Sequence, residues 1–282
     1  MQTLMQREIP VSWFTSGGWF LGYTAGIGHR NVELRTAQYR VSFDDGACLV
    51  LARGWVRAKI ANSRNFLRRN FRGDSPLEEI LQHLAVSMRR AEQAGSMSEL
   101  LGVEGDAARV YFSGFGGMLK QEGGEGWSFE FSGRNRRPPK DPVNAMLSFG
   151  YGVLARLWTV TLVTVGFDPY RGFYHQPRYG RPALALDMME SFRPLLADSV
   201  VLTAINNGEV RREDFQIVPG GVWLSDRGRR KFLEVFERRL EQEITHPLLG
   251  YKLSYRRLLE LQARLLARGM EVGCSCLFFS AV

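Results

Sequence analysis

Two acidic side chains lie in a segment that is otherwise suited to burial. Residues 183–192, ALALDMMESF, are strongly apolar, yet they contain Asp187 and Glu190. If this segment is a helix, the spacing of three places both carboxylates on one face. Like charges one turn apart inside a core repel each other unless a cation lies near them. The segment therefore predicts a buried acidic pair with a cationic partner.

A third carboxylate shows the same anomaly in the segment MSELLGVEGDAARVYF, residues 97–112. A helical projection of this segment gathers its apolar residues into one stripe, and Glu104 lies at the centre of that stripe. Burying an unpaired carboxylate costs several kcal/mol. Glu104 is therefore expected to be protonated, to pair with an arginine, or to bind a metal ion.

A histidine precedes the acidic pair, since His175 lies 12 positions before Asp187 and 15 before Glu190. One imidazole with two or three carboxylates forms a mixed nitrogen and oxygen ligand set, which suits Mg²⁺ or Mn²⁺. Such an ion activates a water or hydroxyl and stabilises the charge on a phosphodiester. The spacing alone leaves an alternative open, in which an arginine such as Arg193 neutralises the acids and His175 is an ordinary loop residue.

Basic residues cluster in two places. Lys59, Arg64 and Arg68 lie late in one predicted helix, and Arg134, Arg136 and Arg137 crowd the loop GRNRRPPK. Such clusters bind DNA phosphates without reading sequence, although each run taken singly also fits a solvated helix or loop face. Two residues of the following helix, Asn144 and Tyr151, are candidate DNA or active-site contacts.

The composition is that of a globular protein whose basic balance favours a polyanionic partner, nucleic acid before an anionic membrane surface, although a merely basic soluble protein fits the charge equally well. The chain has 282 residues, 45% of them apolar and 23% charged, with a formal net charge of +8. This balance favours nucleic acid as the partner. Three cysteines do not form a disulfide framework, and the N-terminus shows no signal peptide, so we expect a cytoplasmic protein. The apolar run 153–167 is expected to be a buried core helix and not a membrane span.

The elements that must position these residues are mostly helical. Residues 9–23 predict a β-hairpin, residues 208–225 a small polar hairpin, and residues 116–142 a long break. Helices are expected at 44–71, 76–95, 97–112, 143–165, 183–197, 225–246 and 251–268. The predicted class is α+β, with a short β-rich N-terminal remnant at 1–29 and a large all-α catalytic domain at 30–282, whose tail 270–282 is atypical.

Several of these motifs together resemble the CRISPR-associated integrases of the Cas1 family, which capture new spacers. LLGVEGDAARVYF resembles the family's glutamate motif, and GRNRRPPKDPVNAMLSFGYGVL its arginine-rich loop and following helix. GFDPYRGFYHQPRYGRPALALDMMESFRP resembles its histidine-plus-acid motif. Family members usually carry several more strands before the point matching residues 9–22, so we expect this chain to lack much of the β domain.

The resemblance implies a metal-dependent DNA endonuclease and integrase of CRISPR adaptation. Glu104, His175 and Glu190 would be the catalytic residues and would hold Mg²⁺ or Mn²⁺, with Asp187 as a second-rank ligand beside them. A protospacer 3′-hydroxyl would attack a phosphodiester at the leader–repeat junction. The implied partners are double-stranded and branched DNA, a second copy in a homodimer, the Cas2 protein, and a fused or associated Cas4 exonuclease. Membranes are not among them.

A second hypothesis from another class is a non-catalytic DNA-binding scaffold of the adaptation complex. The expected loss of much of the β domain motivates it. A scaffold would bind DNA tightly and in a salt-sensitive way without metal-dependent chemistry, so metal-dependent nicking would exclude it. The catalytic hypothesis predicts that Glu104, His175 and Glu190 converge within metal-bonding distance of one point.

Overall fold

The computed structural model describes residues 1–7, 9–15, 20–24, 31–73, 76–120, 128–247 and 249–272. The N-terminal part contains α1 (Gln2–Gln6), β1 (Val11–Phe14) and β2 (Phe20–Thr24). The next helices are α2 (Val32–Ser42), α3 (Asp45–Asn70), α4 (Leu77–Gln93), α5 (Met97–Phe115) and α6 (Pro142–Val165). They are followed by α7 (Ala183–Met189), α8 (Ser199–Asn206), β3 (Phe215–Val218), β4 (Gly221–Leu224), α9 (Asp226–Glu241), β5 (Glu243–Thr245), β6 (Lys252–Ser254) and α10 (Tyr255–Val272).

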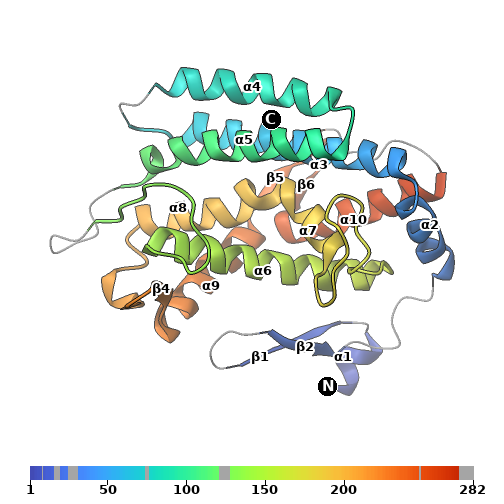
Figure 1. The fold of residues 1–282 in the computed structure, drawn as a ribbon. Coiled ribbons are helices and arrows are strands. Elements are labelled where there is room, and N and C mark those ends of the chain that lie inside the picture. The colour runs from blue at the N-terminus through green and yellow to red at the C-terminus, as the bar shows by residue number, and fades with distance from the viewer. Residues whose placement is uncertain are drawn as a thin grey trace.

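The helical part of the chain forms one continuous core. In Figure 1, α3, α4 and α5 lie together as one layer, and α6 to α10 form a second layer beneath them. The core runs from Leu34 to Leu266 and includes the fully buried Trp55 of α3 and Trp158 of α6. Because α3 also packs against the segment that follows α7, it joins the two layers. The candidate acids lie where these layers meet.

The N-terminal hairpin confirms the prediction for residues 9–23. Strands β1 and β2 pair antiparallel, with Val11 opposite Thr24 and a shift in register after Trp13. The hairpin lies to one side of the helices in Figure 1, and none of its described residues belongs to the core. The predicted boundary between residues 29 and 30, and residues 273–282 of the predicted tail, lie outside the described residues. The division into two domains stays a prediction.

The predicted helix starts are confirmed where a capping side chain was available. The Asp44 carboxylate accepts the backbone N–H of Ala47 at the start of α3, and the Ser225 hydroxyl accepts that of Gly228 at the start of α9. Such N-caps satisfy amide groups that have no partner within the helix. The predicted hairpin at 208–225 is also present, as β3 paired with β4.

Three predictions for the second half of the chain are wrong. The helices expected over 225–246 and 251–268 are both shorter where they approach each other, because Glu243–Thr245 form strand β5 and pair with β6 (Lys252–Ser254). Helix α9 therefore ends at Glu241, and α10 begins at Tyr255. The helix expected over 183–197 is broken into α7, a 3₁₀ turn (Glu190–Phe192) and a π-helical segment (Arg193–Asp198) that leads into α8. Pro194 accounts for part of this break, because a proline removes one helical hydrogen bond.

Helix α6 has the length and hydropathy of a membrane span by composition alone. In this fold α6 packs against α7, α8 and α10, and 39% of its most apolar 18-residue window is buried. The predicted core helix is therefore confirmed for one face of α6.

Candidate active site

Asp187 is the centre of a hydrogen-bonded loop that fixes His175. The Asp187 carboxylate is fully buried and accepts the backbone N–H groups of Phe173, Tyr174 and His175 at 2.7, 3.1 and 2.8 Å. It also accepts His175 Nδ1 at 2.7 Å. Because this bond places the ring proton on Nδ1, the lone pair of the neutral imidazole lies on Nε2. Asp187 therefore orients the histidine and has its own oxygens engaged.

Gly172 permits this arrangement. A Cβ at this position would lie 2.8 Å from Asp187 Oδ2 and 2.9 Å from Ala183. Real Cβ atoms do not approach other atoms so closely, so only glycine lets the loop close around the carboxylate.

Glu104 and Glu190 meet across a lysine. Glu104 comes from α5 and Glu190 from the 3₁₀ turn after α7, and the Lys59 ammonium of α3 forms ion pairs with both. The distance from Lys59 Nζ to Glu190 Oε2 is 2.7 Å. Burial alone would lower the pKa of Lys59, but the two glutamates raise it above its usual range. The ammonium is therefore charged and lies between the two carboxylates.

Glu190 is held as an anion inside the protein. Its side chain is only 3% exposed, and burial alone would raise its pKa. The positive charges of Arg193 and Lys59 instead lower the pKa of Glu190 to about 2. Arg193 Nη2 lies 2.9 Å from Glu190 Oε1. The arginine that the sequence offered as an alternative partner is therefore present, together with a lysine that the sequence did not place there.

The residues present fit a divalent cation, although they are not arranged as a finished ligand set. His175 Nε2 lies 3.8 Å from Glu190 Oε1, a gap that one ion with ligand bonds of about 2.0–2.1 Å spans. Among the described residues, no three acidic or histidine side chains are grouped closely enough to bind a metal as they stand. The reason is Lys59, whose ammonium separates Glu104 from Glu190. His175 and Glu190 therefore lie close together, whereas Lys59 separates Glu104 from Glu190. The predicted convergence of all three side chains on one metal ion stays a prediction.

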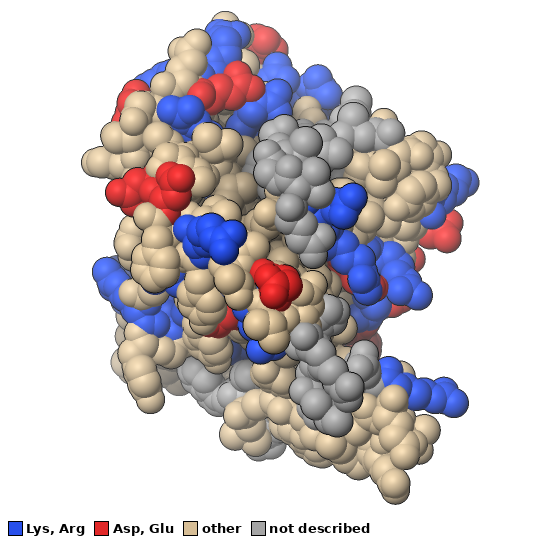
Figure 2. All heavy atoms as spheres, turned by 90° about the vertical axis from the view of Figure 1, so that its right-hand side faces the viewer, with Lys and Arg blue, Asp and Glu red and all other residues tan. Residues whose placement is uncertain are grey.

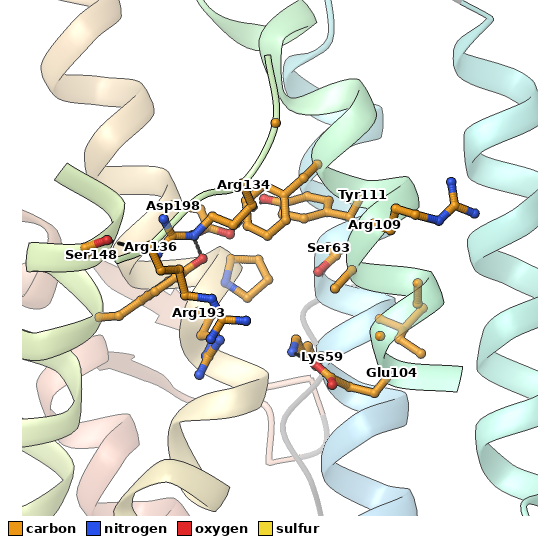
Figure 3. Close-up of a pocket in the computed structure, with 18 of the residues that line it drawn as sticks. Lys59, Ser63, Glu104, Arg109, Tyr111, Arg134, Arg136, Ser148, Arg193 and Asp198 are labelled. Carbon is orange, nitrogen blue, oxygen red and sulfur yellow. Dashed lines mark hydrogen bonds and ion pairs between the residues drawn. The ribbon is translucent and has the colours of Figure 1, made fainter. Parts of the chain in front are cut away.

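A cavity of about 770 Å³ opens beside these acids. Figure 3 shows Lys59 and Glu104 on one wall and Arg134, Arg136 and Arg193 on the opposite wall. Arg109 and Arg137 also line it. A concave surface with this many cations and few anions favours a phosphate-bearing ligand.

A buried network holds the arginine wall in place. The Asp198 carboxylate, 1% exposed, accepts the hydroxyl groups of Tyr111 at 2.8 Å and Tyr151 at 2.7 Å. The guanidinium carbons of Arg193 and Arg134 lie 4.7 and 5.4 Å from the centre of the Tyr151 ring. Because a π-helix bonds residue i to residue i+5, Arg193 and Asp198 lie one turn apart and both reach the cavity.

Tyr174 contributes a polar group with no partner. Its side chain is buried, and its hydroxyl forms no hydrogen bond to any described residue. Burial raises the pKa of Tyr174, and the nearby Glu104 and Glu190 raise it further. A buried hydroxyl without a partner costs free energy, so its presence beside the acids is consistent with a ligand that completes its hydrogen bonding.

The predicted DNA-binding residues fall into three groups. Arg68, Arg136 and Arg137 are exposed, as phosphate-binding residues must be. On the side of the molecule that faces the viewer in Figure 2, basic and acidic side chains are interspersed. Arg64 donates to the Leu81 carbonyl at 3.0 Å, and Arg134 donates to Asn144 at 2.7 Å, so both are partly engaged within the fold.

Lys59 and Asn144 differ from their predicted positions. Lys59 is buried, because its helix face packs against α5 and the turn at Glu190, and is not part of an exposed basic face. Asn144 is fully buried and binds the backbone of Gly133 and Asn135 together with Asp141. It shapes the arginine-rich loop and has no exposed atom to offer DNA. Tyr151 is half-buried and lines the cavity.

The sequence held a signal for one residue that was missed. Asp198 lies in LLADSVV, residues 195–201, which is an acid in an apolar run like Asp187. Applying the same criterion to this segment predicts Asp198. No comparable pattern distinguishes Tyr111 or Tyr174 from ordinary core aromatic residues.

Comparisons with known proteins give a consistent result. The model of the family described as CRISPR associated protein Cas1 matches residues 1–238. A protein of Geobacter sulfurreducens named a CRISPR-associated exonuclease Cas4/endonuclease Cas1 fusion is 60% identical over 94% of this chain and 48% of its own length. A CRISPR-associated endonuclease Cas1 of Thermus thermophilus is 42% identical over 93% of this chain and 76% of its own length. The chain thus spans about half the length of the first curated relatives it matches.

A solved structure has the same fold. A chain of a Cas6-RT-Cas1–Cas2 complex is similar over all of this chain and 30% of its own length, with a TM-score of 0.82 and 27% identity.

Proposed function

Because this chain belongs to the CRISPR-associated Cas1 family, we propose that it is a metal-dependent DNA endonuclease and integrase of CRISPR adaptation. The observation that carries the proposal is a chain of close contacts from Glu104 through Lys59 and Glu190 to His175, next to an arginine-lined cavity that Glu104 and Lys59 line. A buried acid with a strongly shifted pKa, here Glu190, next to a cavity is typical of a catalytic centre.

Each side chain has a part in this chemistry. Glu104, His175 and Glu190 would hold Mg²⁺ or Mn²⁺, and such an ion activates a hydroxyl and neutralises the phosphate. Asp187 holds His175 so that Nε2 faces Glu190. Arg193, which stacks on the Tyr151 ring and pairs with Glu190, lines the cavity and would bind a phosphate oxygen that enters it.

The reaction exchanges one phosphodiester for another. The 3′-oxygen of the incoming DNA forms a bond to phosphorus, and the bond from phosphorus to the 3′-oxygen of the cut strand breaks. The attacking hydroxyl loses a proton and the leaving oxygen gains one. Because one phosphodiester bond replaces another, the reaction requires no outside energy source. The same site would cut branched DNA if water replaced the attacking hydroxyl.

The proposed partners are inferred from the proteins that this chain resembles. The first curated relatives carry a Cas4 exonuclease in the same chain, and the structural neighbour forms a complex with Cas2. We therefore infer that this chain works with Cas2, with a fused or associated Cas4, with a second copy of itself, and with double-stranded and branched DNA in the cytoplasm.

The test compares two acid variants with a matched control. Glu104→Gln and Glu190→Gln keep the side-chain shape, and Glu234→Gln changes an exposed glutamate of α9 that does not line the cavity. With Mn²⁺ and a leader–repeat duplex, the first two variants should lose nicking and half-site insertion, and the control should retain both. Full strand transfer by both active-site variants would refute the proposal.

A DNA-binding scaffold without catalysis is the second candidate. The observation in its favour is that Lys59 fills the space between the two glutamates. A scaffold would bind DNA tightly and with strong salt dependence, yet would show no metal-dependent nicking. Detecting such nicking in the wild-type protein and its loss in Glu190→Gln rules this candidate out.

A further inference from the structure

Lys59 is buried at a position where its ammonium loses most of its contact with water. Only 11% of its side chain is exposed, and it reaches the site from the middle of α3. Burying an ammonium is favourable only when its charge is compensated at close range. Both of its partners are the carboxylates proposed to hold a metal, so one cation serves two acids from different segments.

The ion pairs formed by Lys59 and Arg193 with the two glutamates are balanced in charge. Lys59 and Arg193 each carry one positive charge, and Glu104 and Glu190 each carry one negative charge, so these four charges sum to zero. A divalent cation between the glutamates adds two positive charges beside Lys59, and the Asp187 carboxylate, which accepts from His175, offsets one of them. An ammonium about 4 Å from such an ion is strongly repelled in a poorly hydrated site. Lys59 and a divalent metal therefore compete for the same carboxylates.

We propose that the Lys59 ammonium occupies the place of a divalent metal between the two glutamates, so that a metal binds only by displacing it. The displaced ammonium then pairs with a DNA phosphate in the adjoining cavity. This rests on the proposed function, since it deepens the account of the same site. The displaced ammonium can reach the cavity, because Lys59 already lines it together with Arg134, Arg136 and Arg193. A phosphate there offsets part of the excess positive charge that the metal creates.

This exchange makes metal and DNA binding cooperative. A ligand that draws Lys59 away from the glutamates raises the affinity of the site for metal, and by linkage metal raises the affinity for DNA. Without DNA the lysine keeps metal affinity low. The site would thus be loaded fully only when both the ion and the nucleic acid are present.

The test measures Mn²⁺ binding by electron paramagnetic resonance, with and without a short DNA duplex. Lys59→Met removes the charge and retains much of the side-chain volume. Its Mn²⁺ affinity without DNA should exceed that of the wild type by about tenfold, the change in a binding constant that about 1.4 kcal/mol produces. With DNA present the difference should shrink. Lys59→Gln is a second variant in case the methionine disturbs folding, which circular dichroism checks.

The control is Lys231→Met. Lys231 is a lysine of α9 that pairs with Asp214 and does not line the cavity. The control variant should bind Mn²⁺ as the wild type does. Unchanged or weaker Mn²⁺ binding in folded Lys59→Met and Lys59→Gln would overturn the inference.

Failure of the inference can be told apart from failure of the proposed function by including Glu190→Gln. If the wild type binds Mn²⁺ through Glu190 and the lysine variants do not bind more tightly, only the inference fails. If no variant binds Mn²⁺, with or without DNA, both fail.

Discussion

Replacing Asp198 by asparagine should change how the stability of the protein depends on pH. Burial raises the pKa of Asp198 from 3.8 to about 6, while the hydroxyl groups of Tyr151 and Tyr111 and the charges of Arg193 and Arg134 oppose that rise. A carboxyl group whose pKa is higher in the folded state holds its proton more tightly when folded. Its contribution to stability is therefore lost as the pH rises from about 4 through about 6.

The size of the effect follows from that pKa. A pKa raised from 3.8 to about 6 corresponds to about 3 kcal/mol, because one pKa unit is worth about 1.4 kcal/mol. Roughly 2 kcal/mol of this is titrated between about pH 4.5 and about pH 7.5. An asparagine side chain does not titrate, so relative to the wild type the Asp198→Asn variant should gain about 2 kcal/mol of stability across that interval.

The assay is urea unfolding of both proteins at several pH values, followed by circular dichroism. Taking the difference between the two proteins removes the titration of all other groups. The same substitution at Asp226, an exposed residue of α9 with a side chain 67% exposed, controls for the loss of a surface carboxylate. A difference that stays constant with pH, or that favours the wild type as the pH rises, would refute the burial argument.

Two further predictions concern the loop before α7. Tyr174→Phe removes a buried hydroxyl without a partner among the described residues, so thermal unfolding should show a stability gain of about 1 kcal/mol, together with reduced strand transfer if the hydroxyl contacts the ligand; a loss of stability would show that the hydroxyl has a partner in the free protein. Asp187→Asn weakens the hold on His175 and should lower Mn²⁺ affinity by about 10–100-fold in a titration; unchanged affinity would contradict the orienting role of Asp187.

Local physics made much of this fold predictable. Asp44 and Ser225 indicate the starts of α3 and α9, because their oxygens satisfy amides that a helix leaves free. The sequence also indicates Asp187, Glu190 and Glu104 as candidates, because burying an acid within an apolar segment is unfavourable unless a partner compensates its charge. These signals depend only on neighbouring residues, which the sequence shows directly.

Lys59 shows where such reasoning ends. In the sequence it is one of several basic residues late in a helix, and no local pattern separates it from Arg68. Only the packing of α3 against α5 and the Glu190 turn decides that the lysine lies inside while Arg68 lies on the surface. Asn144 was misplaced for the same reason, since its partners Gly133 and Asn135 come from the preceding loop.

The buried lysine also explains how the fold tolerates its acids before any ligand arrives. Glu190 would be protonated or destabilising if burial acted alone, because desolvation raises the pKa of a carboxyl group. Lys59 and Arg193 reverse that tendency, so the carboxylate is ionised and ready to bind a cation. Under the exchange proposed above, the same two cations would compete with a divalent metal for Glu190. One set of ion pairs would then both keep Glu190 ionised and make metal binding depend on a phosphate.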